Sequence, residues 1–317
     1  MRKLRAAVIG LGRIGMGYDY KERGNKVIAT HAMAFAKDPA FQLVGAVDPD
    51  KFRRKAFTKK YSKLAFENID ELFKKTSPEV IALAVPTKFH APVFARVIKY
   101  RPKAVILEKP LAHNLVSAGN IPVLVNYPRR FEPGANQLKE LIRSGGLGEI
   151  YKGVVWYSKG ILNNGSHYID LLLWLLGDAT ELRVINKGRL WDKTDPEPDF
   201  VVKFGKAEVF FLACREEKFS IVDMELIGTK GKVSYANFGL DIQYWPCVSD
   251  PVYPGYTILG PKSKRISSDL HRSQLHVQRH LAQYLSGKKK DLISSTKTAL
   301  RTMEIINDIL SKRGAKR

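Results

Sequence analysis

The chain has 317 residues, of which 44% are hydrophobic, so it is long enough for two domains and apolar enough to bury a large core. Its 53 Lys and Arg residues against 31 Asp and Glu residues give a formal net charge of +22. The apolar content argues against a disordered chain, and every apolar run is too short for a membrane span. The two cysteines are too few for a disulfide framework. We therefore expect a cytoplasmic protein.

The first third of the chain alternates short β-rich apolar runs with helical patterns, which is typical of a parallel sheet with crossover helices. Strands are predicted at Leu4–Ile9, Phe41–Val47, Val80–Val85, Ala104–Leu107 and Val123–Val125, with a weaker one at Lys63–Phe66. Helices are predicted between them at Thr30–Lys37, Asp50–Tyr61, Ile69–Lys75 and His90–Tyr100.

From about residue 126 the pattern changes to longer alternating segments, and short links such as Gly228–Gly231 predict hairpins and an antiparallel sheet. Strands are predicted at Ile150–Tyr157, Glu181–Arg189, Phe200–Phe204, Glu208–Ala213, Ser220–Ile227, Lys232–Ala236 and Asp241–Trp245. Helices are predicted at Glu132–Ser144, Asn164–Leu176, Ser268–Ser286 and Ser294–Lys312. The chain is therefore expected to be α/β first and α+β second.

A glycine loop follows the first predicted strand directly, with Gly10, Gly12 and Gly15 in the spacing G-x-G-x-x-G. The first glycine allows a tight turn, the second lets the backbone approach a pyrophosphate, and the third permits close helix–strand packing. The phosphates would meet the positive end of the next helix, where Arg13 and Ile14 lie. This context predicts a dinucleotide site; the alternative is an ordinary glycine turn.

The second predicted strand ends in an acid, Asp48, which can accept hydrogen bonds from the adenosine ribose hydroxyls and repel a 2′-phosphate. This favours NAD as the cofactor. Lys51, Arg53 and Arg54 follow closely, and one of them could pair with a phosphate, so NADP stays possible.

The distance from Gly15 to Asp48 is unusual, at 33 residues against about 20. The excess is the polar stretch 17–26, which we expect to interrupt the first crossover helix until about Thr30. It is either a tolerated surface loop or a flap that brings Tyr18 or Tyr20 over the nicotinamide side.

Several further motifs complete a set in chain order. They are Val85–His90, the Glu108-Lys109-Pro110 triplet after the fifth strand, Asn126–Phe131, Gly165–Asp170 and Gly228–Gly231. Together with the glycine loop, over nearly the whole chain, they resemble the Gfo/Idh/MocA oxidoreductase family.

The resemblance implies an N-terminal Rossmann domain with a parallel sheet, here residues 1–122. It implies a C-terminal α+β domain, residues 123–317, with a large, mostly antiparallel open sheet that makes homo-oligomer contacts and a last helix that packs back on the first domain. The implied activity is nicotinamide-dependent oxidation or reduction of a sugar, polyol or nucleotide sugar.

The family's functional residues correspond to matching positions. Lys109 matches the lysine that contacts the substrate hydroxyl and assists proton transfer, and His167 matches the active-site histidine. Pro86 and His90 lie in the loop that passes the cofactor, and Glu108 lies near the nicotinamide ribose.

The chemistry of Lys109 also follows from the residues, because hydride transfer from a carbinol needs a base for the hydroxyl proton and parallel sheets bind ligands at their carboxyl edge. His167 and Asp170 are three residues apart on one helix and can share a face. Asp170 either orients the imidazole of His167 or binds a substrate hydroxyl. The alternative for His167 and Asp170 is a buried pair with a structural role, and the alternative for Lys109 is an exposed lysine in a turn.

One position departs from the family pattern, since many members carry an aspartate where this chain has Asn163, and an amide cannot relay a proton. Asn163 and Asn164 resemble the corresponding residues of members that act on amino-sugar nucleotides.

Arg129 and Arg130 are candidates to bind an anionic substrate or to form interdomain ion pairs. The alternatives are a cyclitol or monosaccharide dehydrogenase and an inactive NAD-binding regulator.

The positive charge raises nucleic acid as a partner, but the basic residues are spread over both halves of the chain. The sequence has no zinc-ligand spacing, no aromatic RNA-binding strand and no basic arm. We therefore expect no metal, no specific nucleic-acid partner and only weak attraction of polyanions at low salt.

Overall fold

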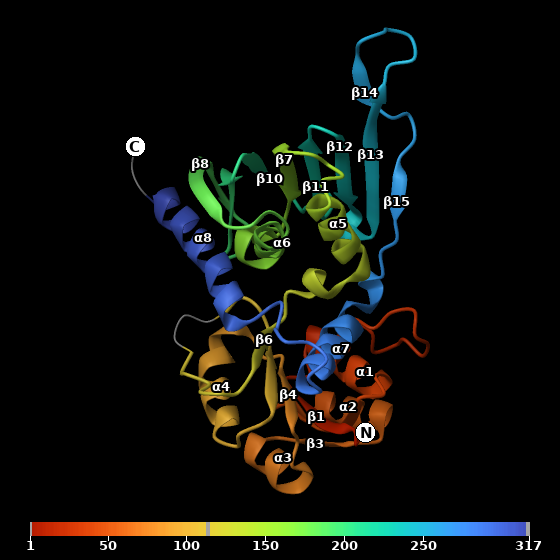
Figure 1. The fold of residues 1–317 in the computed structure, drawn as a ribbon. Coiled ribbons are helices and arrows are strands. Elements are labelled where there is room, and N and C mark those ends of the chain that lie inside the picture. The colour runs from red at the N-terminus through yellow and green to blue at the C-terminus, as the bar shows by residue number, and fades with distance from the viewer. Residues whose placement is uncertain (1, 112–114, 315–317) are drawn as a thin grey trace. The chain divides into compact units, whose positions relative to one another are not determined.

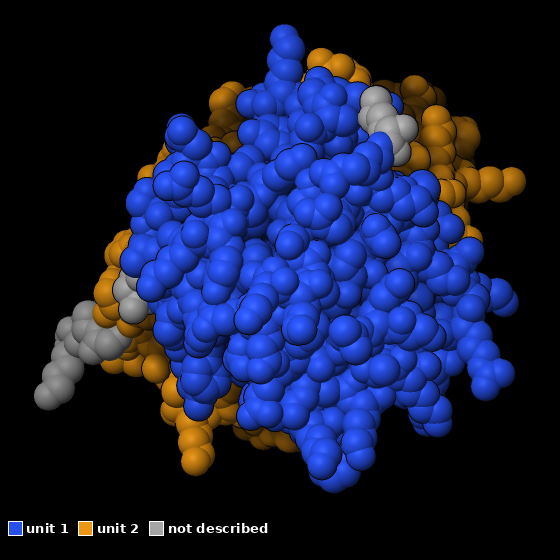
Figure 2. Space-filling view, turned by 90° about the horizontal axis from the view of Figure 1, so that it is seen from below, with its two compact units in different colours: residues 1–131, 271–300 blue, residues 132–270, 301–317 orange. Residues whose placement is uncertain are grey.

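The computed structural model describes residues 2–111 and 115–314, and they form two compact units (Figures 1 and 2). Unit 1 comprises residues 1–131 and 271–300, and unit 2 comprises residues 132–270 and 301–317. The predicted division after residue 122 differs from these units, because residues 123–131 and 271–300 group with the first. The reason is that β6 (Val123–Val125) completes the first sheet, and α7 (Ser273–Leu285) contributes Val277 and Leu281 to its core.

Unit 1 is built on a six-stranded sheet in the order β3-β2-β1-β4-β5-β6, in which every pair is parallel. Besides β6, its strands are β1 Leu4–Ile9, β2 Phe41–Val47, β3 Leu64–Phe66, β4 Val80–Leu83 and β5 Ala104–Leu107. All residues of β4 and β5 are buried, as expected for central strands covered on both faces. The predicted Rossmann sheet is confirmed, including its weakest strand.

Unit 1 has five α-helices among the described residues, and the first three in the chain begin at side-chain caps that hold their first free N–H groups. The five helices are α1 His31–Lys37, α2 Lys51–Tyr61, α3 Ile69–Thr76, α4 His90–Ile98 and α7. Thr30, Asp50 and Asn68 accept hydrogen bonds from the N–H groups of α1, α2 and α3 respectively.

Unit 2 contains a nine-stranded sheet in the order β14-β13-β12-β11-β7-β10-β9-β8, with β15 paired to β13. Only β7 and β10 pair in parallel, so the sheet is mostly antiparallel, as predicted. The strands are β7 Ile150–Tyr157, β8 Ala179–Leu190, β9 Pro196–Phe204, β10 Ala207–Ala213, β11 Val222–Gly228, β12 Gly231–Ala236, β13 Asp241–Ser249, β14 Thr257–Leu259 and β15 Lys264–Ile266.

The last two strands were not predicted, because each has three residues and neither has an inward face to show in its sequence. Both consist of exposed or half-buried residues. In Figure 1 they lie along β13, whose far end extends with β14 beyond the rest of the sheet.

Three helices accompany this sheet: α5 Pro133–Arg143, α6 Ser166–Leu176 and α8 Thr296–Gly314, whose first residues group with unit 1. A one-turn helix, Gly160–Gly165, precedes α6. The prediction that α6 is buried holds, because the ring of Tyr168 meets Tyr235 edge-on and its hydroxyl donates to the Val222 carbonyl. In the described residues, no helix is both long and apolar enough to span a membrane.

Candidate functional site

The glycine loop has two glycines that the protein's own packing requires and one that it does not. Gly10 has a φ of +95°, and a Cβ there would lie 2.6 Å from the Ala84 carbonyl oxygen. A Cβ at Gly15 would collide with the Gly10 carbonyl oxygen, whereas one at Gly12 would meet nothing within 4 Å. Gly12 therefore borders open space, which is the cradle that a pyrophosphate needs.

That open space belongs to a cavity of about 710 Å³ at the carboxyl edge of the unit 1 sheet, a volume within the usual range for small-molecule sites. Six of the predicted cofactor residues line it: Gly10, Gly12, Arg13, Ile14, Asp48 and Pro86. Gly15, His90 and Glu108 do not line it. The residues present thus fit a dinucleotide, with a phosphate cradle and an acid in one cavity.

The acid of this cavity is firmly held. Asp48 is buried; its Oδ2 accepts a hydrogen bond of 2.7 Å from the Leu11 N–H, and its Oδ1 accepts one of 2.8 Å from the Asp50 N–H. Each carboxylate oxygen keeps a second lone pair for a ribose hydroxyl. Arg54 donates to the carbonyls of Asp48 and Pro49 and is therefore already used by the protein.

Of the basic residues that follow Asp48 closely, Arg53 lines the cavity, whereas Lys51 and Arg54 do not. Arg53 is half exposed, and its Nη1 lies 3.7 Å from Asp48 Oδ2. A 2′-phosphate would have to approach Arg53 while the Asp48 carboxylate repels it. The geometry therefore sets one cation against one anion at the position that distinguishes NAD from NADP.

The stretch 17–26 interrupts the first crossover helix as predicted: a single helical turn, Arg13–Gly17, ends there, and α1 begins only at His31. Its anchor is Asp19, which is buried and accepts hydrogen bonds of 2.9 Å from the N–H of Ala29 and of Thr30. The loop thereby holds the two residues that lead into α1, including its N-cap Thr30.

The two tyrosines of this loop have different positions. Tyr20 donates a hydrogen bond to the Ala56 carbonyl on α2, and Lys60 donates to the carbonyls of Asp19 and Tyr20 at 2.6 and 2.7 Å. Tyr20 is thus held against α2. Tyr18 is 62% exposed and lines the cofactor cavity, so a flap hypothesis rests on Tyr18 alone.

The turn after β5 carries Glu108 and Lys109 at the same sheet edge as the glycine loop, because β1, β4 and β5 are parallel neighbours. The Glu108 carboxylate accepts a hydrogen bond of 2.5 Å from Asn126 Nδ2 and lies 2.8 Å from His31 Nε2. His31 is completely buried, and its carbonyl accepts from Gln278 on α7. Sequence reasoning missed His31, since nothing in the sequence connects it with a residue 77 positions later.

His90 opens α4 beneath the loop that follows β4. Its Nε2 lies 3.0 Å from the Val85 carbonyl, to which the N–H donates, and only 1% of the residue is exposed. Burial lowers the pKa of His90, although the carbonyl of Val85 and the charge of Glu108 partly oppose this. His90 is therefore neutral at pH 7 and holds the Pro86 loop.

The helical turn before α6 is fixed by two buried carboxylates of β9 and the residue before it. Asp195 accepts hydrogen bonds of 2.8 and 2.9 Å from the N–H groups of Leu162 and Asn163. Glu197 accepts one of 2.8 Å from the N–H of Lys159. Sequence reasoning missed both acids; they lie in a segment without a recognised motif.

The predicted substrate residues of unit 2 are distributed around this turn. His167 is half-buried in the first turn of α6, while Asp170 is 1% exposed and accepts a hydrogen bond of 3.2 Å from Thr302 Oγ1. Asn164 Nδ2 donates to the Ser158 carbonyl. Asp170 and Asn164 thus each have a structural partner, and their role toward a substrate stays a prediction.

Arg130 lies in unit 1, where it is 3% exposed and donates a hydrogen bond of 3.1 Å from Nη1 to the Ile293 carbonyl. This contact helps to fasten residues 271–300 to the first sheet. Within residues 2–111 and 115–314, no group of three or more His, Cys, Asp or Glu side chains could hold a metal ion.

Residues 4–125 match the model of an oxidoreductase family with an NAD-binding Rossmann fold, GFO_IDH_MocA. Residues 4–125, which hold all six strands of the unit 1 sheet, belong to the Gfo/Idh/MocA family. The family predicted from the motifs is confirmed over these residues, and the match is to an oxidoreductase family that binds NAD.

Curated relatives of the chain include the inositol 2-dehydrogenase of Corynebacterium glutamicum, 26% identical over 247 residues that span 71% of this chain and 67% of the relative. A second is the inositol 2-dehydrogenase of Rubrobacter xylanophilus, 26% identical over 166 residues that span 45% of this chain and 47% of the relative.

Solved structures share its fold at low sequence identity. The WlbA dehydrogenase of Bordetella pertussis, in complex with NADH and UDP-GlcNAcA, superposes with a TM-score of 0.76 at 18% identity, over 98% of this chain and 96% of its own. An oxidoreductase of Agrobacterium radiobacter, in complex with NAD+, L-tartaric acid and magnesium, superposes with a TM-score of 0.75 at 16% identity, over 100% and 98%.

Proposed function

We propose that this Gfo/Idh/MocA enzyme transfers a hydride between NAD and a secondary hydroxyl or ketone of a sugar-type substrate. The observation that carries the proposal is the cavity in which the open side of Gly12 and the anchored carboxylate of Asp48 lie together. Bound NAD supplies the hydride acceptor. Everything else in the reaction is a matter of binding, orientation and proton transfer by the chain.

Lys109 is the proposed base. It follows β5 at the sheet edge where the cofactor cavity opens, and it is half-buried. As the hydride leaves the carbinol carbon, its amine accepts the hydroxyl proton, and in the reverse direction its ammonium returns that proton to the ketone oxygen. His167 is the proposed second active-site residue, and Glu108 is proposed to contact the nicotinamide ribose.

We propose a sugar-type substrate, with an amino-sugar nucleotide as the first candidate because of Asn163 and Asn164. The relatives named inositol 2-dehydrogenase favour a second candidate, a free cyclitol. Arg129, half-buried beside Arg130, is the proposed contact for an anionic group of the first candidate. An NAD-binding regulator without turnover is the alternative outside enzymes.

The test is a panel of UDP-linked amino sugars, inositols and simple sugars, followed by the change in nicotinamide absorbance. Turnover of at least one supports the enzyme, and the ranking of kcat/KM assigns the class. No turnover with any of them, while NADH still binds tightly, would contradict the enzyme and favour the regulator.

We propose that NAD is preferred over NADP. The Asp48→Ser substitution should shift the ratio of kcat/KM for the two cofactors toward NADP by roughly 10-fold or more, because it removes the charge that repels the 2′-phosphate while Arg53 stays. A wild-type preference for NADP would contradict the assignment of Asp48.

We also propose a cytoplasmic homo-oligomer that associates through the open face of the unit 2 sheet. The face carries exposed Trp156, and Lys152 forms an ion pair of 2.6 Å with Glu208 on the neighbouring strand. Light scattering of the wild type and of Trp156→Glu tests this association, since a monomeric wild type would contradict it.

The proposed location in the cytoplasm is consistent with Cys214 and Cys247, which are free thiols, as a reducing compartment would keep them. Cell fractionation checks the location.

A further inference from the structure

The insertion 17–26 meets the cofactor cavity at Tyr18, which lines the cavity wall together with Gly12 and Arg13. The Tyr18 side chain is exposed, although the backbone on both sides of it is fixed. Its N–H donates a hydrogen bond of 2.9 Å to the Arg13 carbonyl, and the next residue, Asp19, is buried. An aromatic ring that is exposed on a fixed backbone is a preformed surface for a ligand, because little further ordering is needed on binding.

The buried Asp19 ties the insertion to α1. One of its carboxylate oxygens accepts the N–H of Thr30 at 2.9 Å, and the other accepts the Thr30 hydroxyl at 2.7 Å. Farther along, the N–H of Ile28 donates to the His271 carbonyl at 2.9 Å, and Ile28 is buried in one apolar cluster with Leu275 of α7. The segment that follows the insertion is thus anchored in the packed part of unit 1.

The start of the insertion is held by Lys60 of α2. Its ammonium donates hydrogen bonds of 2.6 and 2.7 Å to the carbonyls of Asp19 and Tyr20, the two residues that follow Tyr18. The same ammonium lies 5.2 Å from the centre of the Tyr20 ring and 5.6 Å from that of Tyr61, within the range of cation–π attraction. A charged donor forms stronger hydrogen bonds than a neutral one, so Lys60 fixes the backbone next to Tyr18.

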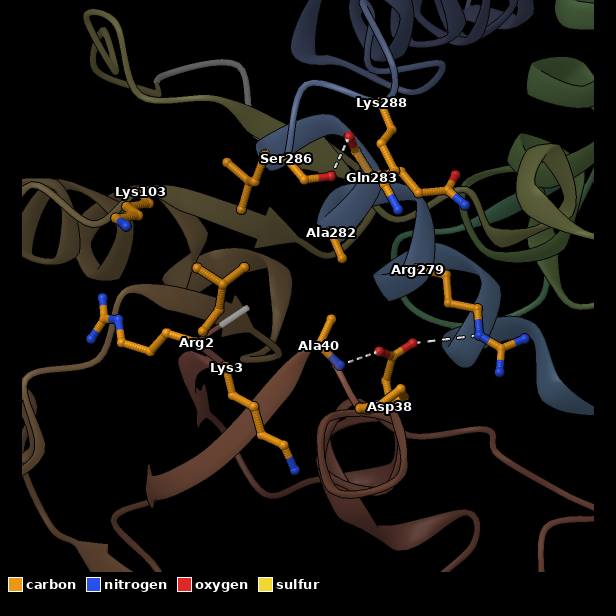
Figure 3. Close-up of a pocket in the computed structure, with 13 residues that line it drawn as sticks. Arg2, Lys3, Asp38, Ala40, Lys103, Arg279, Ala282, Gln283, Ser286 and Lys288 are labelled. Atoms are coloured by element: carbon orange, nitrogen blue, oxygen red, sulfur yellow. Dashed lines mark hydrogen bonds and ion pairs between the residues drawn. The ribbon is translucent and has the colours of Figure 1, made fainter.

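A cavity at the amino edge of the same sheet shows why fixed side chains matter. It has a volume of about 630 Å³ and lies where β1 and β2 begin and along the last turns of α7 (Figure 3). The Lys3 side chain extends away from Lys288, so these two cations do not converge on one ligand group (Figure 3). Asp38 lies 3.5 Å from Arg279 and accepts the N–H of Ala40, contacts that fasten α7 to the turn before β2 (Figure 3).

The Tyr18 ring has no structural use of this kind. Among residues 2–111 and 115–314, no other side chain forms a hydrogen bond or a ring contact with it. An aromatic ring in water gains free energy when a ligand covers it. The cavity that Tyr18 borders is the one that holds the Gly12 cradle and the Asp48 carboxylate, so a bound dinucleotide is the ligand that would cover the ring.

We propose that Tyr18 is a cofactor-binding residue whose ring packs against the bound dinucleotide, and that Lys60 is the positioning residue that keeps the ring at the cavity. The insertion is then a fixed wall of the cofactor site and not merely a tolerated surface loop. The inference rests on the NAD-binding part of the proposed function. It adds to that site a residue from the segment that interrupts the first crossover helix.

The test is a fluorescence titration of the full chain with NADH, without substrate. Tyr18→Ala should bind NADH about 10-fold more weakly, while Tyr18→Phe, which keeps the ring, should stay within about 2-fold of the wild type. The matched control is Phe52→Ala, which removes an exposed ring of α2 that does not line the cavity, and it should also stay within about 2-fold. An unchanged Tm without NADH shows that each variant is folded.

The role of Lys60 is tested by its coupling to Tyr18. Lys60→Met should weaken NADH binding by about 5-fold in the wild type but by less than about 2-fold in Tyr18→Ala, because it acts through the ring. A merely structural role of Lys60 would weaken binding equally in both backgrounds. Lys59→Met, at an exposed position of the same helix, is the control and should leave the NADH affinity unchanged.

Three outcomes would overturn the inference. They are wild-type NADH affinity in Tyr18→Ala, equal weakening by Tyr18→Ala and Phe52→Ala, and a Lys60→Met effect of equal size in both backgrounds. In each of them, tight NADH binding by the wild type leaves the proposed function intact. The proposed function fails by a different result, which is no turnover on the substrate panel while Tyr18→Ala still weakens NADH binding.

Discussion

The turn after β5 carries the candidate catalytic residue Lys109, and the helical turn before α6 leads directly to the second candidate, His167. Buried carboxylates lie at both turns, but they make different kinds of contact. In the first turn the acid, Glu108, is the neighbour of Lys109 and is held by the side chains of His31 and Asn126. In the second, Asp195 and Glu197 come from elsewhere in the chain and hold backbone N–H groups.

The difference separates two kinds of sensitivity. Glu108 is held by hydrogen bonds from other side chains, and these can be removed while the backbone keeps its path. Changes near Glu108 should therefore lower turnover more than the free energy of unfolding. Acids that hold backbone N–H groups determine the path itself, because buried N–H groups without acceptors cost about 1–3 kcal/mol each. Changes near Asp195 should therefore affect the free energy of unfolding first.

The largest expected effect is at Lys109. Lys109→Ala should lower kcat by at least about 100-fold because the hydroxyl proton then has no base, while NADH still binds. Lys74→Ala, at an exposed position on α3, is the control and should leave kcat unchanged. Near-normal turnover of Lys109→Ala would contradict the assignment of Lys109 as the catalytic base.

Substitutions in the helical turn before α6 should lower the free energy of unfolding. Gly160 has a φ of +79°, and a Cβ there would collide with the Asp195 carboxylate, so Gly160→Ala should cost about 2–4 kcal/mol in urea unfolding. Gly205→Ala is a matched control with a φ of +58° and nothing within 4 Å, and should cost about 1 kcal/mol. Equal costs would show that Asp195 does not constrain this turn.

A smaller effect is expected at His31, as a positioning residue. His31→Ala should lower kcat by about 10-fold with little change in NADH affinity, since Glu108 loses one of its two holders. His31→Gln, which keeps a donor, should recover most of that loss. A purely structural role would instead lower the unfolding free energy of both variants and leave the kcat of the folded protein alone.

The smallest effect concerns pH. Because burial depresses the pKa of His90 in the folded state, the unfolded chain takes up a proton first as the pH falls. The stability from neutral His90 is thus complete above the ordinary histidine pKa and is lost below it. His90→Asn should flatten the fall in unfolding free energy between about pH 7 and 5. His280, whose pKa is also lowered, keeps part of the slope in either protein.

The sequence predicted the parts of the fold that repeat a pattern. Buried strands such as β4 and β5 are continuous apolar runs, and the spacing of Gly10, Gly12 and Gly15 identifies the cofactor cavity. The two short strands beside β13 have no buried face, and no alternation of hydrophobicity could have revealed them.

The candidate site was predicted where its residues are consecutive and missed where they are distant. Glu108 and Lys109 are neighbours in a motif. His31, Asp195 and Glu197 become part of the site only through folding, since their partners lie more than 30 residues away. Their neighbours in the sequence contain no indication of a site.

The contact between His31 and Glu108 also has a consequence for how the protein is made. It closes a loop of 77 residues, and we expect the acid to meet its histidine only once β1, β2, β4 and β5 lie in register, because long-range contacts carry a larger loop-closure cost than local ones. A chain that has collapsed but not ordered this sheet would lack the support of Glu108. The recovery of turnover during refolding should therefore lag behind the recovery of helical circular dichroism.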